Sequence, residues 1–104
     1  MISKRQEKLL DFVIKEYIRI AKPIGSVLAA NKSHLHFSSA TIRNEMNDLE
    51  SQGFLIQLHT SGGRVPTDKA YRYYVNSLIE NEISLDLGAE YKNKITILKL
   101  HGFI

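Results

Sequence analysis

The sequence contains no cysteine, only two prolines and no long apolar run among its 104 residues. The absence of thiols excludes a disulfide framework, a cysteine nucleophile and a cysteine-based zinc site. No apolar run approaches the roughly 20 residues that a helix needs to cross a bilayer. The first residues, MISKRQEK, lack the apolar core of a signal peptide. We therefore expect a cytoplasmic protein that makes no membrane contact.

Motifs of enzymes and metal sites are also absent. The sequence has no nucleophile elbow, no HExxH motif and no GxxxxGK(S/T) phosphate loop. His34 and His36 are two residues apart, but no third ligand follows at a spacing typical of a metal site. We therefore predict that the protein is not an enzyme and that it holds neither a cofactor nor a metal ion.

The composition is that of an ordinary globular domain, with 43% hydrophobic and 24% charged residues. A chain of this length can bury one modest core. The net charge of +3 permits an anionic partner but does not require one. The positions of the charges therefore matter more than their sum.

The N-terminal segment predicts an amphipathic helix that begins at Ser3. Gln6 follows three residues later, which is the spacing of a capping box. One face collects apolar side chains at helical spacing, namely Leu9, Leu10, Val13, Ile14, Tyr17 and Ile20. Phe12 falls on the polar side, where either the C-terminal segment or a partner covers it or it is singly exposed. Pro23 ends this helix.

Two further helices are expected between Pro23 and Gly53. Ser26 is predicted to cap a brief helix over 27–32, whose candidate core contacts are Val27, Leu28 and Ala30. Ser38 or Ser39 is predicted to cap a third helix that runs to about Gln52. Its inner side carries Ile42, Glu45, Met46 and Leu49. Gly53 is expected to close it in the left-handed conformation.

A β-hairpin and a fourth helix are predicted next. Residues 54–58 form the first strand, Gly62 and Gly63 turn the chain, and Arg64 and Val65 form a short return strand. Thr67 is expected to cap the fourth helix. Its predicted buried face consists of Ala70, Tyr71, Tyr74, Val75, Leu78 and Ile79. A fifth helix is expected from Ser84, so that residues 1–80 form the main domain and 81–104 form a helical connector or the start of a regulatory region.

The outer face of the third helix carries residue types that suit the base edges of duplex DNA. Arginine can pair with guanine and asparagine with adenine, while small side chains meet the thymine methyl group. The candidate DNA-binding residues on this helix are Ser39, Ala40, Thr41, Arg43, Asn44 and Asn47. A solvated polar face is the alternative, and Glu45, Asp48 and Glu50 favour it because carboxylates repel phosphates.

The hairpin and the start of the fourth helix add groups that bind phosphates or enter a minor groove. The candidate residues are His59, Thr60, Ser61, Gly63 and Arg64 in the hairpin, and Lys69 and Arg72 in the fourth helix. The alternatives are a plain hairpin turn and ordinary surface charge.

Three stretches carry a family resemblance, namely RQEKLLDFVIKEYI, PIGS and SSATIRNEMNDLESQGFLIQLHTSGGRVPTDKAYRYYV. Together they closely resemble the N-terminal domain of the bacterial heat-inducible transcription repressor HrcA, over roughly Arg5 to Leu78. The resemblance implies a mainly α-helical winged helix-turn-helix with a small β-hairpin wing. It also implies binding to an inverted-repeat DNA operator upstream of chaperone operons, and modulation by the chaperonin.

The family continues for a few hundred residues into a regulatory and dimerising region. The resemblance therefore implies a homodimer in full-length members, and we expect weak dimerisation of this 104-residue chain. The alternative function is a winged-helix module that binds proteins and not DNA. In that case Phe12 and the C-terminal segment would form the contact.

Overall fold

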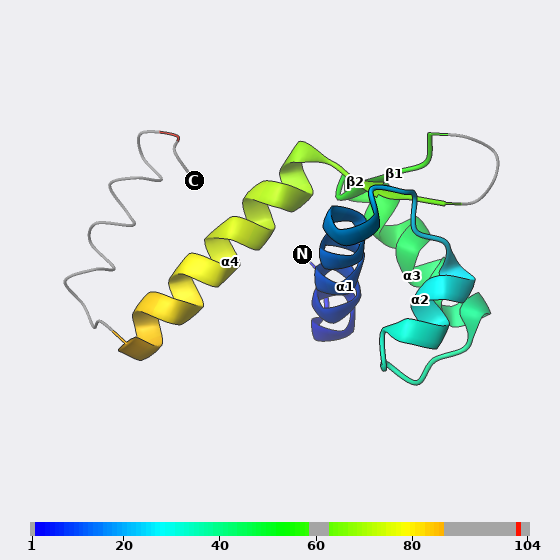
Figure 1. Ribbon diagram of the computed structural model, residues 1–104, viewed down its shortest axis with the longest axis horizontal. Helices are drawn as coiled ribbons and strands as arrows, with labels where there is room; N and C mark the ends of the chain where they lie inside the picture. The colour runs from blue at the N-terminus through cyan, green and yellow to red at the C-terminus, as the bar shows by residue number, and fades with distance from the viewer. Residues whose placement is uncertain (1, 59–62, 87–101, 103–104) are drawn as a thin grey trace. The chain divides into compact units, whose positions relative to one another are not determined.

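The computed structural model describes residues 2–58, 63–86 and 102. The elements follow in the order α1 (Lys4–Ile20), α2 (Ser26–Lys32), α3 (Ser39–Ser51), β1 (Leu55–Ile56), β2 (Val65–Pro66) and α4 (Asp68–Asp86), as Figure 1 shows. The chain divides into two compact units, one up to Tyr71 and one from Arg72 onward. The predicted fold class, mainly helical with a β-hairpin, is confirmed.

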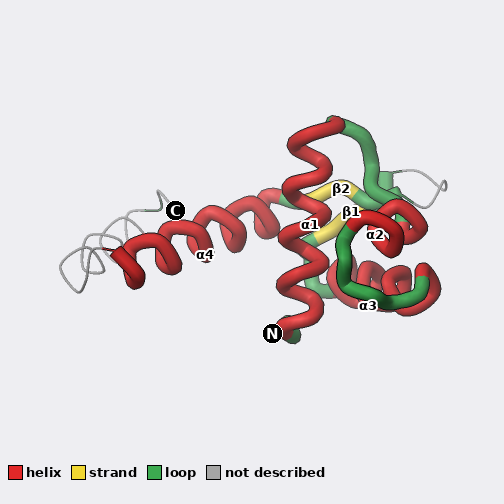
Figure 2. Tube along the Cα trace, turned by 60° about the horizontal axis from the view of Figure 1, so that its bottom comes forward, coloured by secondary structure: helices red, strands yellow, loops and turns green. Residues whose placement is uncertain are grey.

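The helix α1 packs against α2, α3 and β2 in the first unit (Figure 2). The capping box is present, because the Gln6 amide donates to Ser3 Oγ at 3.1 Å and the Ser3 amide donates to Gln6 Oε1 at 3.1 Å. The predicted inner residues Leu9, Leu10, Val13 and Ile14 are fully buried, while Tyr17 and Ile20 are half-buried. The first predicted helix is therefore confirmed.

The helix α3 begins and ends where its sequence predicts. Ser38 is the N-cap, and its Oγ accepts the Thr41 amide at 3.2 Å. At the other end Gly53 has φ +86°, and the amides of Gly53 and Phe54 donate to the carbonyls of Glu50 and Leu49. This pattern is a Schellman motif, which requires the left-handed residue that glycine supplies. The buried side of α3 consists of Ile42, Met46 and Leu49.

The predicted core contacts of α2 are partly wrong. The helix begins at Ser26, with Gly25 as its N-cap, and not after a capping Ser26. Val27 is 60% exposed, and the buried positions are Ser26 and Ala29. A helix of two turns is too short for hydrophobic periodicity to determine which side faces the core.

The hairpin strands are shorter than predicted and joined by an additional bridge. In the antiparallel pair, Leu55 lies opposite Pro66 and Ile56 opposite Val65. Arg64 forms an isolated bridge with Ile24, with N–H to O distances of 2.8 and 2.9 Å in the two directions. The link after α1 therefore acts as a third short strand beside the wing, which completes a winged-helix arrangement.

The helix α4 agrees with its prediction at its start and differs from it on its buried face. Thr67 caps it, since its Oγ1 accepts the Ala70 amide at 3.3 Å, and Ala70 is fully buried. Val75 and Leu78 are 42% and 44% exposed, so the predicted buried face is wrong at these positions. Periodicity identifies an apolar stripe but does not show whether another surface covers it.

The prediction of a new helix from Ser84 is also wrong at its start, because residues 84–86 continue α4 without a break. The remainder of that predicted helix, residues 87–101, lies outside the described residues. The domain boundary near residue 80 stays a prediction. Within the part of the chain that is described, no helix combines the length and the apolar character needed to cross a bilayer.

Candidate nucleic-acid interface

The helix α3 carries the DNA-binding residues that were predicted on the third helix, and most of them lie on its exposed side. Ala40, Arg43, Asn44 and Asn47 are exposed, while Ser39 and Thr41 are half-buried in the first turn. Among residues 2–58, 63–86 and 102, no side chain bonds to the Arg43 guanidinium or the Asn44 amide. These two groups are therefore available to an external partner.

Two of the carboxylates that counted against DNA binding are engaged by α1 and by α3 itself. Glu45 forms an ion pair with Arg5, whose Nη2 lies 3.0 Å from Glu45 Oε1. Asp48 Oδ2 accepts hydrogen bonds from Gln6 Nε2 and, at 2.9 Å, from Gln52 Nε2. The Arg5 guanidinium partly offsets the charge of Glu45 and so reduces its repulsion of a docked phosphate, whereas the neutral amides of Gln6 and Gln52 hold Asp48 in place and leave its charge unchanged.

Arg64 connects the wing to α3. Its side chain is nearly buried, its Nη2 donates to Asn47 Oδ1, and its Nε lies 2.8 Å from Glu50 Oε1. The guanidinium predicted at an exposed wing tip is therefore held between two residues of α3. The third carboxylate, that of Glu50, is engaged by the same contact.

Gly63 has a steric role at the base of the wing. A Cβ atom at this position would lie 2.7 Å from Pro23 Cβ and 3.3 Å from the Pro23 carbonyl carbon. Only glycine lets the returning wing strand approach the link after α1 this closely. The other predicted wing residues, His59, Thr60 and Ser61, lie outside the described residues.

A groove of about 410 Å³ lies between α2, α3 and the wing. Three of the predicted DNA-binding residues line this groove together, namely Arg43, Asn47 and Arg64. The groove is also lined by residues that sequence reasoning missed, namely Gly25, Ser26, Val27 and Gln57. The exposure of Val27 identifies it in the structure, but its apolar character made it a core candidate in the sequence.

Lys69 lies at the C-terminal end of α3, away from the first turn where base contacts were predicted. Its Nζ donates to the Gln52 carbonyl at 2.7 Å and sits 4.6 Å from the Phe54 ring centroid. A cation is favourable at this end of a helix dipole. Arg72 is exposed and belongs to the second unit, so it is not placed relative to α3.

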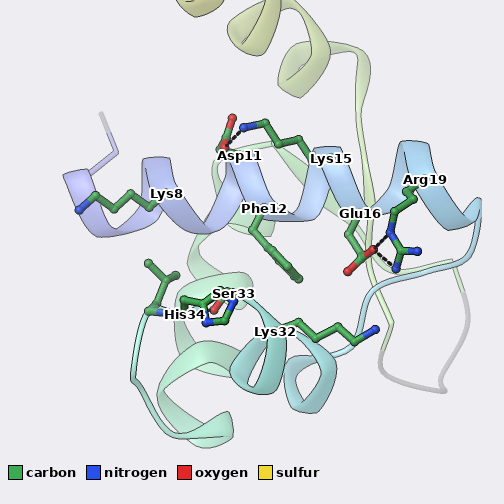
Figure 3. Close-up of a pocket in the computed structure, with 10 residues that line it drawn as sticks. Lys8, Asp11, Phe12, Lys15, Glu16, Arg19, Lys32, Ser33 and His34 are labelled. Atoms are coloured by element: carbon green, nitrogen blue, oxygen red, sulfur yellow. Dashed lines mark hydrogen bonds and ion pairs between the residues drawn. The ribbon is translucent and has the colours of Figure 1, made fainter.

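A second, open groove of about 550 Å³ lies between α1 and the turn after α2 (Figure 3). Phe12 points into this groove, opposite Ser33 and His34, and is half-buried there. Two ion pairs, Lys15–Asp11 at 2.9 Å and Arg19–Glu16, lie along its α1 side. This groove contains none of the predicted DNA-binding residues. The described residues also contain no group of three His, Asp or Glu side chains suited to a metal ion.

Comparison with known proteins identifies homologues along most of the chain. The heat-inducible transcription repressor HrcA of Thermoanaerobacter pseudethanolicus is 48% identical over 97 residues, which are 93% of this chain and 28% of that protein. The HrcA proteins of Brevibacillus brevis and Bifidobacterium animalis subsp. lactis are 51% and 49% identical, over 77% and 92% of this chain. No family model matches the chain.

A crystal structure of a hypothetical protein shares the fold, with a TM-score of 0.70 and 41% identity. The match covers 85% of this chain and 27% of that one. The chain thus spans only about a quarter of the proteins that it matches. Over that segment it is a winged-helix homologue of the heat-inducible transcription repressors HrcA, as the resemblance in its sequence predicts.

Proposed function

We propose that this chain is a sequence-specific duplex DNA-binding module of a transcriptional repressor of heat-shock genes. The first turns of α3 enter the major groove, where Ser39, Ala40, Thr41, Arg43 and Asn44 face the bases. The wing contacts the backbone or the minor groove through His59, Thr60 and Ser61. The operator is an inverted repeat, and the site of action is the cytoplasm.

The observation that carries this proposal is the arrangement of charge on α3. Arg43 and Asn44 are exposed and have no bonding partner within the described ranges, whereas Glu45, Asp48 and Glu50 are each held by a neighbouring side chain. Arginine and asparagine in the early turns of a recognition helix are the side chains best suited to base edges. The names of the homologues support a repressor of heat-inducible genes.

The first test is a mobility-shift titration of the 104-residue chain with an inverted-repeat duplex and a scrambled duplex of equal composition. Binding through about six phosphates should weaken roughly 10³-fold between about 50 and 200 mM salt, because released counterions drive it. Equal affinity for both duplexes at every salt concentration would contradict sequence-specific binding.

The second test concerns the proposed base contacts. Arg43→Ala or Asn44→Ala should each cost about 1–3 kcal/mol of binding free energy and relax the base preference, whereas loss of a phosphate contact weakens all sequences alike. Lys69→Ala serves as the comparison. Because the Lys69 amine bonds to the Gln52 carbonyl at the far end of α3, its loss should affect all DNA sequences alike and leave the base preference unchanged. Unchanged affinity and specificity of the Arg43 variant would remove it from the interface.

A protein-interaction module is the second candidate, and the groove that holds Phe12 is the observation that favours it. The family resemblance implies that the protein partner is the chaperonin. It also implies a homodimer, formed through a region outside this segment. A protein contact at Phe12 would respond to salt, because most of the side chains that line this groove are charged, but it would not depend on the side chains exposed on α3. The Arg43 and Asn44 variants therefore separate the two candidates.

A further inference from the structure

The contact between Arg64 and Asn47 determines which way the Asn47 amide faces. Arginine has five N–H donors and no acceptor, so the atom of Asn47 that meets it must be the carbonyl oxygen. The structure has this arrangement, with Arg64 Nη2 donating to Asn47 Oδ1. The Nδ2 group of Asn47, with its two donors, is therefore the end of the amide left for other partners.

Arg64 is itself fixed from several directions. Its Nε lies 2.8 Å from Glu50 Oε1, and its backbone is bonded in both directions to Ile24. With only 7% of the residue exposed, the guanidinium has little room to change partners. The orientation of Asn47 is therefore tied to the position of the wing.

Asn47 is exposed and lines the groove beside Arg43. An asparagine that pairs with adenine uses both ends of its amide, since the oxygen accepts from N6 and the nitrogen donates to N7. Arg64 takes one of the two lone pairs of the Asn47 oxygen and holds that end of the amide against a nearly buried guanidinium, so the end of Asn47 that is turned to other partners is its N–H donors. Purine N7, guanine O6, thymine O4 and phosphate oxygens are the DNA atoms that accept such a donor.

We propose that Asn47 contacts DNA only as a hydrogen-bond donor, and that Arg64 is a positioning residue that sets this polarity and does not itself hold a phosphate. The inference rests on the proposed duplex DNA binding. It predicts that the wing influences recognition through α3, in addition to any contact that the wing makes itself.

The first experiment compares variants on a duplex selected by the unaltered chain from a random pool. Asn47→Ala and Arg64→Ala should each weaken binding by roughly 5- to 100-fold. The double variant should be little weaker than the worse single variant, since both changes remove the same oriented donor. Arg19→Ala is the matched control, because it also removes one guanidinium, but from the ion pair with Glu16 on α1. This control should bind nearly as the unaltered chain does.

The second experiment identifies the acceptor with modified DNA and needs only Asn47→Ala, whose fold is checked by thermal unfolding. A 7-deazapurine at one position, or a methylphosphonate at one phosphate, should abolish the difference in DNA affinity between the unaltered chain and Asn47→Ala. The first result assigns purine N7 and the second assigns a phosphate, while a difference in affinity that survives every such modification assigns guanine O6 or thymine O4. Purine in place of adenine, which lacks the 6-amino group, should leave the difference intact at every position.

Three results would overturn the inference. The first is full binding by Asn47→Ala, the second is additive losses in the double variant, and the third is loss of the Asn47 contribution on removal of an adenine 6-amino group. Failure of the unaltered chain to bind any duplex would instead overturn the proposed function, and the inference with it. The two failures are therefore distinguishable.

Discussion

Ala21 follows α1 with φ 54° and ψ 35°, in the left-handed region where L-residues other than glycine are uncommon. The conformation lets the Ala21 amide donate to the Tyr17 carbonyl at 2.8 Å and so complete the helix end. An L-residue with a Cβ atom is disfavoured there by roughly 1–2 kcal/mol relative to its right-handed conformation. The end of α1 therefore carries a local strain that one substitution can relieve.

Ala21→Gly should raise the free energy of unfolding by about 0.5–1 kcal/mol, because relief of this strain exceeds the added entropy of the unfolded chain. Urea denaturation monitored by circular dichroism measures the change. Ala30→Gly in α2 is the control. It should lower the free energy of unfolding by about 1 kcal/mol, because glycine is less favourable than alanine inside a helix. Equal losses in both variants would show that Ala21 is not strained.

Tyr71 makes stability depend on alkaline pH. Burial raises the pKa of its hydroxyl, and the nearby Tyr17 raises it further because two phenolates would repel. The unfolded chain releases this proton near pH 10, whereas the folded chain retains it. The contribution of Tyr71 to stability is therefore fully present below about pH 10 and is lost as the pH rises through the folded pKa.

Tyr71→Phe should remove this part of the alkaline loss. We expect the free energy of unfolding of the variant to fall less between about pH 8 and pH 10.5 than that of the unaltered chain. Urea titrations at the two pH values provide the comparison. An identical fall in both proteins would contradict the assignment to Tyr71.

At the scale of elements, the wing depends on close contacts at its base. Arg64 pairs with Ile24 through the backbone and with Asn47 and Glu50 through its side chain. Gly63 allows the chain to approach Pro23. The link after α1, the wing and α3 thus share one set of contacts.

Gly63→Ala should lower the free energy of unfolding by about 1–3 kcal/mol, because its Cβ atom would overlap Pro23 and the rigid ring cannot rotate away. Thermal unfolding provides the measurement. Gly25→Ala is the matched control, since no atom lies within 4 Å of the point that a Cβ atom would occupy there, and the expected cost is only that of a poorer N-cap on α2, roughly 0.5–1 kcal/mol. A Gly63 variant as stable as the control would show that the wing base adjusts freely.

At the scale of the whole molecule, an inverted-repeat operator requires two copies of the reading helix related by two-fold symmetry. The resemblance to HrcA implies that the dimerising region lies in the part of the relatives that this chain does not span. We therefore expect the 104-residue chain to sediment as a monomer at low micromolar concentration and to bind an operator half-site weakly. A tight dimer in sedimentation velocity would contradict this prediction.

Most features that depend on neighbouring residues were predictable from the sequence alone, although the cap of α2 lies at Gly25 and not at the predicted Ser26. The capping box at Ser3, the Ser38 cap and the Gly53 stop all follow from hydrogen bonds and backbone angles within a few residues. The buried faces of α1 and α3 follow from helical periodicity over three or more turns. The long match from Ser38 to Val75 also carried the family resemblance that the comparisons confirm.

Only the tertiary structure decided the roles of residues whose partners are distant in the chain. Asn47 and Arg64 are 17 residues apart, as are Gln52 and Lys69, and no local pattern indicates that either pair is bonded. The exposure of Val27 likewise depends on how α2 packs, because two helical turns do not define a face. The sequence by itself therefore determined the helices, the hairpin and the family. The assembled fold decided which polar groups remain open to a partner and which already bond within the protein, because that choice depends on long-range packing.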